Sequence, residues 1–129
     1  MKVIRIEELQ GTEREVHCPH GGFISYRALL AKDNMGFSLH KTVIPAGAAE
    51  HWHYTRHLEA CYCIAGYGVL TNLATKEQFV IVPDTIYALD LHDDHLFQAH
   101  EKTVLISIFT PPVTGGEVHQ RDGSYAAAK

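Results

Sequence analysis

The sequence lacks the features that mark membrane, secreted and nucleic-acid-binding proteins. Its longest apolar run is Ala60–Ala65, far short of the roughly 20 residues that a transmembrane helix needs. Glu7 and Glu8 stand where a signal peptide has its apolar stretch. Lysines and arginines are scattered and the formal net charge is −4, which disfavours nucleic acid or a membrane surface as a partner. We therefore expect a cytoplasmic protein.

Cysteine is scarce, and the three that occur cannot all be paired. Cys61 and Cys63 lie two residues apart in an apolar run, so on a strand they point the same way and do not easily bridge each other. Reduced, buried thiols are expected, as in a reducing cytosol.

Helical periodicity is weak, and short segments rich in Val, Ile, Thr, Tyr and Phe dominate instead. Together with the length of 129 residues and an apolar fraction of 46%, they predict one all-β domain over residues 1–129, an antiparallel sandwich or small β-barrel of two jelly-roll-like sheets. Only Arg5–Gly11 is expected to form a short helix. Residues 111–129 read as a C-terminal tail, either mobile or folded over the barrel mouth. The expected strands are Phe23–Ala31, Gly36–Ile44, His51–Tyr54, Leu58–Ile64, Gly68–Leu73, Gln78–Val82, Thr85–Leu89, His95–Ala99 and Thr103–Phe109.

One stretch carries most of the chemical information. The spacing of Gly47, His53, Glu59 and Gly66 matches the first sequence motif of the cupins, except that Thr55 stands where a second histidine is usual. The segment Val82–Tyr87 partly matches the second cupin motif. A small barrel brings inward residues of different strands within metal-bond distance, so the ligands need not be contiguous.

Two ligand sets are open on these residues. The general cupin pattern uses His53 and Glu59 with a residue of the second motif. The alternative set is Glu59, Tyr87 and His95, which offers a carboxylate, a phenol and an imidazole. This mostly oxygen set suits Fe(II) best and also accepts Zn(II) or Mn(II).

Over nearly its whole length the chain resembles the ectoine synthase family of cupins. The resemblance is specific, because it rests on long matching segments rather than on one motif. These are Gly11–Val16, Met35–Ser38, His53-Tyr54, His57–Ala60, Tyr62–Ile64, Tyr87–Asp90, His92-Asp93 with His95, Pro111-Pro112, Thr114-Gly115 and Glu117–His119.

The resemblance implies an iron enzyme, a lyase that makes an osmoprotective compatible solute. Its substrate is N-γ-acetyl-L-2,4-diaminobutyrate, which closes to the cyclic product ectoine with loss of water, in a cytoplasmic head-to-tail homodimer. It also implies that Glu59, Tyr87 and His95 bind the metal. By matching position, the expected catalytic residues, left unranked as base or acid, are Tyr54, Glu117 and His119, and the expected substrate-binding residues are Phe23, Arg27, Thr42 and Phe109.

Several positions depart from the family. Phe23 stands where a tryptophan is usual, Ser107 where a cysteine is expected, and Tyr26, Asp84 and Gly116 also differ. The altered pocket leaves a related enzyme with a different substrate open. Two other functions remain as alternatives: another metal-dependent cupin enzyme, such as a dioxygenase or isomerase, and a cupin that only binds a small ligand.

Overall fold

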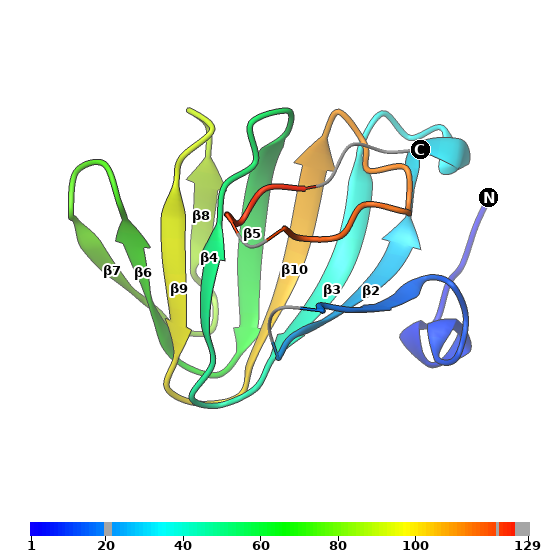
Figure 1. Ribbon diagram of the computed structural model, residues 1–129. Helices are drawn as coiled ribbons and strands as arrows, with labels where there is room; N and C mark the ends of the chain where they lie inside the picture. Colours follow the sequence, from blue (N-terminus) through cyan, green and yellow to red (C-terminus); the bar gives the residue numbers. More distant parts are fainter. Residues whose placement is uncertain (20–21, 121, 126–129) are drawn as a thin grey trace.

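Two antiparallel β-sheets form the protein in the computed structural model, which describes residues 1–19, 22–120 and 122–125 (Figure 1). The larger sheet has the strand order β1-β2-β3-β10-β5-β8, and the smaller has the order β4-β9-β6-β7. The predicted all-β architecture of two sheets is confirmed. The strands are β1 (Glu15–His17), β2 (Ile24–Leu29), β3 (Ser38–Ile44), β4 (Ala49–Trp52), β5 (Leu58–Ala65), β6 (Gly68–Asn72), β7 (Gln78–Ile81), β8 (Ile86–Leu89), β9 (His95–Ala99) and β10 (Thr103–Thr110).

Side-chain alternation determines which face of each strand lines the interior. In β3 every second residue from Ser38 to Ile44 is buried, and β10 repeats this pattern from Thr103 to Phe109. A strand points successive side chains to opposite faces, so the inner face of the larger sheet carries many polar residues. The smaller sheet contributes bulkier inward side chains, among them Trp52 and Phe97, which are 4% and 0% exposed.

The sequence-based elements are correct at nine strands and wrong at the N-terminus. Strand β1, only three residues long, was not predicted. The expected helix at Arg5–Gly11 is a 3-10 turn covering only Ile6–Leu9. An isolated segment this short cannot repay the cost of nucleating an α-helix. None of the helices among the described residues is long and apolar enough to cross a membrane.

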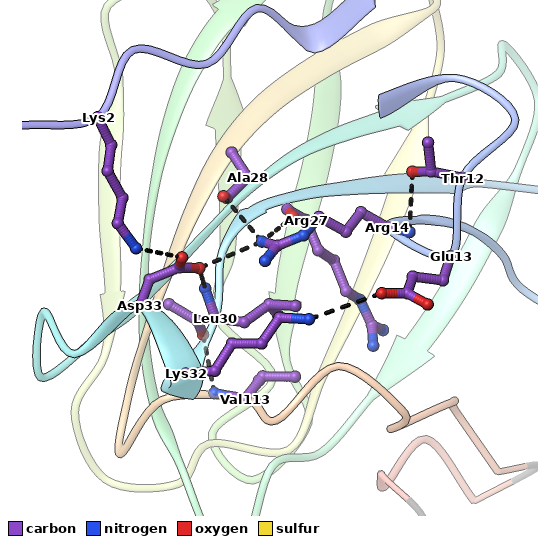
Figure 2. A network of polar contacts seen from close by, with 11 residues as sticks. Lys2, Thr12, Glu13, Arg14, Arg27, Ala28, Leu30, Lys32, Asp33 and Val113 are labelled. Carbon is purple, nitrogen blue, oxygen red and sulfur yellow. Dashed lines mark hydrogen bonds and ion pairs between the residues drawn. The ribbon is translucent and has the colours of Figure 1, made fainter. Parts of the chain in front are cut away.

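Asp33 ties the N-terminal segment to the barrel, as Figure 2 shows. Its carboxylate accepts hydrogen bonds from Lys2 Nζ at 2.6 Å, from the backbone N–H of Leu30 at 2.8 Å and from Arg14 Nη1 at 3.2 Å. The hydrogen bond from Lys2 has the largest effect, and those from Leu30 and Arg14 add to it. Together they hold the pKa of Asp33 well below its ordinary value. One half-buried carboxylate therefore holds two segments that lie 31 and 19 residues away from it along the sequence.

The described part of the C-terminal segment, residues 111–120 and 122–125, crosses from one sheet to the other (Figure 1, orange to red). The backbone N–H of Val113 donates to Ser38 Oγ of β3 at 3.0 Å, and its carbonyl accepts from Ala31 N at 2.9 Å. Further along, the Gly123 carbonyl accepts from the N–H of His53, just beyond β4, at 2.9 Å. Residues 121 and 126–129 of the predicted tail lie outside the described residues.

Candidate active site

A row of inward polar side chains crosses the larger sheet from β2 to β8, with one residue on each of these five neighbouring strands. The register places Arg27 of β2 opposite His40 of β3, and His40 opposite Ser107 of β10. Ser107 in turn lies opposite Cys61 of β5, and Cys61 lies opposite Tyr87 of β8. Directly opposed residues on one face have Cβ atoms only about 5 Å apart. These five residues, called here the polar row, therefore form a continuous band on the inner wall.

Hydrogen bonds link the polar row to its neighbours on the same wall. Ser107 Oγ lies 3.3 Å from Thr42 Oγ1 and 3.5 Å from Cys61 Sγ. Ser25 Oγ lies 3.4 Å from His40 Nδ1. The wall thus carries uncharged hydroxyl, thiol and imidazole groups that point inward, and Arg27 is its charged member.

Three atoms of the expected metal ligands lack hydrogen-bond partners within the described chain. They are Glu59 Oε1 on β5, Tyr87 OH on β8 and His95 Nε2 on β9. His95 donates its Nδ1–H to the Asp93 carbonyl at 2.9 Å, so the neutral ring has its Nε2 lone pair free, as metal-binding histidines do. Buried polar atoms without partners are costly, and a carboxylate oxygen, a phenol oxygen and an imidazole nitrogen are each able to bind a cation.

Burial keeps these three groups uncharged when no cation is bound. It raises the pKa of Glu59 to about 8, against weaker opposing hydrogen bonds from Cys61 and Ser107. Burial likewise raises the pKa of the Tyr87 phenol well above its ordinary value and lowers the pKa of His95. Among residues 1–19, 22–120 and 122–125, no three His, Cys, Asp or Glu side chains gather as a metal site. The set here contains only two of those residue types, because its third member is a tyrosine.

Six of the predicted site residues line a single small cavity between the sheets. Its free space is about 10 Å³, close to the minimum that one water molecule needs. The residues that line it are the predicted Phe23, Thr42, Tyr54, Glu59, Phe109 and His119, together with Ser25, His40, Trp52, Ser107 and Tyr125. Tyr87 and His95 instead line a larger open pocket of about 640 Å³ on the β7–β8 side.

Tyr54 and His119 form the shortest polar pair in the cavity. The Tyr54 hydroxyl lies 2.6 Å from His119 Nε2. Burial lowers the pKa of His119 to about 3, helped by the charge of Arg27, and burial raises the pKa of Tyr54 well above its ordinary value. The phenol therefore keeps its proton and donates a hydrogen bond to the neutral imidazole. Phe23 packs edge-on against both His119 and Trp52, with ring centroids 5.0 Å apart in each case.

Arg27 is a buried cation without an anionic partner in the described part of the chain. Its side chain is only 1% exposed, and its guanidinium donates to the Gly115 carbonyl at 3.0 Å and to Ser25 Oγ at 3.5 Å. The charge also lies 5.7 Å from the centre of the Tyr125 ring. A buried charge left uncompensated is unfavourable, so this side chain is suited to receive a carboxylate.

Glu117, the third predicted catalytic residue, binds the turn that directly precedes it in the sequence. Its carboxylate accepts hydrogen bonds from Thr114 N, Thr114 Oγ1 and Gly115 N, each at 2.8 Å. Burial favours the neutral form, but these hydrogen bonds prevail and lower the pKa of Glu117. The residue does not line the small cavity. It shapes the segment that carries His119 and the carbonyl bonded to Arg27.

The general cupin ligand pattern does not gather around His53. In β4 the buried residues are Glu50 and Trp52, so the alternate position His51 faces outward, where its Nε2 lies 2.5 Å from Asp94 Oδ1. His53 follows in the same alternation and is half-buried. His51 and His53 therefore share a face of this segment, and that face is the outer one.

Sequence reasoning missed several residues of the cavity. His40 was detectable, since it stands two residues before Thr42 on a strand and must share its face. Its ring is 1% exposed, and its Nε2 lacks a partner within the described chain. Trp52 was detectable in the same way, since it stands two residues before Tyr54 and shares its face. Tyr125 had no local signal, because it lies in a polar segment, which suggests exposure to solvent. Its ring packs against Tyr54 instead, with the two ring centroids 4.8 Å apart.

Comparisons with known proteins agree with this arrangement. The family described as ectoine synthase matches residues 1–129. The L-ectoine synthase of Wolinella succinogenes is 46% identical over 123 residues, which cover 95% of this chain and 94% of that protein. The crystal structure of ectoine synthase from P. lautus has a TM-score of 0.87 and 38% identity, covering 100% of this chain and 92% of that one. A cupin domain of Schizosaccharomyces pombe Cnp3, 14% identical with a TM-score of 0.58 over 68% of this chain and 64% of its own, shares the fold alone. The chain therefore belongs to the ectoine synthase family, a family of hydro-lyases with the cupin fold.

Proposed function

We propose that the protein cyclises N-γ-acetyl-L-2,4-diaminobutyrate to ectoine, with loss of one water molecule. The α-nitrogen forms a bond to the acetamide carbon, the carbon–oxygen bond breaks, and the oxygen leaves with two protons from nitrogen. Family membership supports this reaction over that of a dioxygenase, an isomerase or a simple ligand-binding cupin. A related substrate is the alternative that the departures at Phe23 and Ser107 keep open.

Three buried atoms that have no hydrogen-bond partner within the described residues support a metal-dependent reaction most directly: Glu59 Oε1, Tyr87 OH and His95 Nε2. We propose Fe(II) as the ion held by these residues, with Zn(II) and Mn(II) as ions that the same donors accept. When bound, the cation supplies Lewis-acid polarisation of the amide carbonyl oxygen. Binding requires Glu59 to lose its proton, which burial retains up to a pKa of about 8.

Arg27 is the group that orients the substrate. Its buried guanidinium has two donors in a planar fork that matches a carboxylate, and the substrate is an amino acid with one carboxylate. Aromatic rings of Phe23, Trp52 and Phe109 line the cavity and exclude bulk water from a reaction that must release water. Holding the amine against the amide carbon within one molecule also removes much of the entropic cost of ring closure.

Tyr54 and His119 are the groups that move protons. The neutral imidazole accepts a hydrogen bond from the phenol at 2.6 Å, so the pair can take a proton from the attacking nitrogen and return one to the leaving oxygen. The low pKa of His119 keeps the imidazole unprotonated at neutral pH. Glu117 supports the pair indirectly, because its carboxylate holds the turn that precedes His119.

A head-to-tail homodimer is the proposed assembly. The outer face of the larger sheet exposes Tyr62 by 37%, Ile64 by 45%, Ile86 by 69% and Ile108 by 38%. Tyr62 lies opposite Ile86 on β8, so these side chains form one apolar surface, which soluble monomers rarely leave open. Sedimentation should find a dimer, and Ile86→Asp should shift it toward monomer; a monomeric parent protein would rule out this assembly.

The proposed location is the cytoplasm, and the proposed partner is a small molecule rather than nucleic acid. Cys61 and Cys63 are buried thiols that form no disulfide, as suits a reducing compartment. The net charge of −4 opposes binding to a polyanion. Cell fractionation with an antibody to the protein tests the location; recovery from the periplasm or medium would contradict it.

The first experiment measures the reaction itself. The purified protein is loaded with Fe(II) without oxygen, mixed with N-γ-acetyl-2,4-diaminobutyrate and followed by NMR. Ectoine should form at an enzyme-like rate, and both product and bound metal should be lost in Glu59→Ala. The control variant Glu50→Ala removes another inward carboxyl, which accepts a hydrogen bond from Gly22 N, and should keep the metal. Bound metal without product would mean that the altered pocket serves another substrate.

A further inference from the structure

His40 stands on the inner wall of the larger sheet and has no role in the chemistry described so far. The residue is 1% exposed and lines the small cavity. The register places it directly opposite Arg27 of β2, and its ring packs against Phe109, with the two centroids 5.0 Å apart. The imidazole is therefore held beside the cation that orients the substrate.

A short series of hydrogen bonds determines which ring nitrogen of His40 carries the proton. Arg27 Nε donates to Ser25 Oγ at 3.5 Å, because an arginine side chain can only donate. Ser25 is thus left to donate its own O–H to His40 Nδ1, which lies 3.4 Å away. Burial, aided by the charge of Arg27, lowers the pKa of His40 well below its ordinary value, so the ring is neutral. A neutral ring that accepts at Nδ1 carries its proton on Nε2.

The Nε2–H group of His40 is a buried donor that has no acceptor within the described residues. Leaving such a donor unsatisfied is unfavourable, so the atom is suited to a ligand that brings an oxygen acceptor. Its register neighbour Arg27 also offers only donors. Two donors side by side match a group with two acceptor oxygens and a negative charge, rather than an amine or a single carbonyl.

We propose that His40 Nε2–H donates a hydrogen bond to the substrate carboxylate and shares that group with Arg27. This rests on the proposed function and adds a binding residue to it. Directly opposed residues have Cβ atoms only about 5 Å apart, so the two donors can reach the two oxygens of one carboxylate. The ring of Tyr125 lines the same cavity, with its centre 5.7 Å from Arg27 Cζ, and moves aside to admit the carboxylate.

The reaction itself distinguishes the carboxylate from the amide as the group that His40 binds. Ring closure removes the acetamide oxygen as water, but the carboxylate remains in ectoine. A donor to the carboxylate therefore strengthens the binding of substrate and product alike, whereas a donor to the amide oxygen strengthens the binding of substrate alone. Trp52 reports product binding without turnover, because it is the single tryptophan of the chain and lines the cavity.

The experiment compares ectoine binding with substrate turnover in the Fe(II)-loaded, full-length protein without oxygen. Tryptophan fluorescence gives the Kd for ectoine, and the NMR assay gives the KM for N-γ-acetyl-2,4-diaminobutyrate. His40→Phe keeps a ring and removes the donor, so both constants should rise by a similar factor of about tenfold or more. His40→Gln should restore most of the affinity, because its amide nitrogen is three bonds from Cβ, as Nε2 is. Cys63→Ala, a buried residue of the same sheet that does not line the cavity, should leave both constants unchanged.

The outcomes separate this inference from the proposed function. A raised KM with an unchanged Kd for ectoine would assign the bond to the amide oxygen and overturn the carboxylate contact. Product formation with both constants unchanged in His40→Phe would remove the inference alone, whereas a wild type that neither binds ectoine nor forms it would overturn the proposed function and the inference together. If His40→Phe does not fold, His40→Asn replaces it: its shorter amide should lose the affinity that His40→Gln keeps, and equal constants for the two would refute the contact.

Discussion

Replacing Glu59 by glutamine should remove a pH dependence of stability from the metal-free protein. Burial raises the pKa of this carboxyl from an ordinary 4.5 to about 8. Between these values the unfolded chain has released the proton while the folded chain keeps it. Stability therefore falls by about 1.4 kcal/mol per pH unit in this interval. The contribution of Glu59 is complete below the unfolded pKa and is lost as the pH rises through the folded pKa.

The magnitude follows from integrating that slope. From about pH 6 to about pH 8, the free energy of unfolding of the wild type should fall by about 2 kcal/mol relative to Glu59→Gln. Urea denaturation with a chelator present measures both proteins at each pH. Glu117→Gln is the control, since hydrogen bonds lower the pKa of Glu117, and its carboxyl is ionised in both states over this interval. If the free energies of unfolding of the wild type and Glu59→Gln change in parallel with pH, burial does not raise the pKa of the Glu59 carboxyl. That result would remove the main argument for a cation there.

Three further changes test the rest of the site. Arg27→Met should raise the KM by about 10- to 100-fold, since a charge-assisted hydrogen bond contributes about 1.5–3 kcal/mol; an unchanged KM in steady-state assays would exclude a carboxylate contact. Tyr54→Phe removes the 2.6 Å contact with His119 and should lower kcat by about 10²-fold with little change in KM; a full-rate variant would end the proton-transfer role. Val113→Ala, at a side chain that is 0% exposed, should lower the free energy of unfolding by about 1–3 kcal/mol; thermal or urea denaturation that matches the wild type would show that the C-terminal segment contributes no packing.

The strands were predictable because alternation and turn residues are local signals. The same local signals failed at the two ends of the chain. Strand β1 is too short to show alternation, and it exists because β2 offers an edge for pairing from Glu15 to His17. The acidic residues in Ile6–Leu9 are typical of the first turn of a helix. Gly11 follows with a φ of 75°, which is incompatible with a continued α-helix. Tertiary pairing, which local patterns do not contain, decided both cases.

Single positions of the site were predictable, but the way they combine was not. The family resemblance indicated Glu59, Tyr87 and His95, and each of them has a buried atom with no hydrogen-bond partner in the part of the chain that the structure describes. The juxtaposition of Cys61 with Ser107 depends on a register between strands that are 46 residues apart along the chain. The burial of His119 was also hidden, because a polar segment suggests exposure to solvent. The polar groups of this segment form hydrogen bonds with one another, as between Thr114 and Glu117.

The polar row also links the chemistry of the protein to how faithfully it folds. A slip of one residue between any two neighbouring strands would turn a whole set of side chains to the opposite face. A misregistered molecule would lose Arg27 or Tyr87 from the interior altogether, so it would be inactive rather than altered in specificity. The contact between Thr42 and Ser107 spans 65 residues of sequence, and pairings of such long range form slowly. Activity should therefore return during refolding only with the last of these pairings, and no partly folded form should be able to act on substrate.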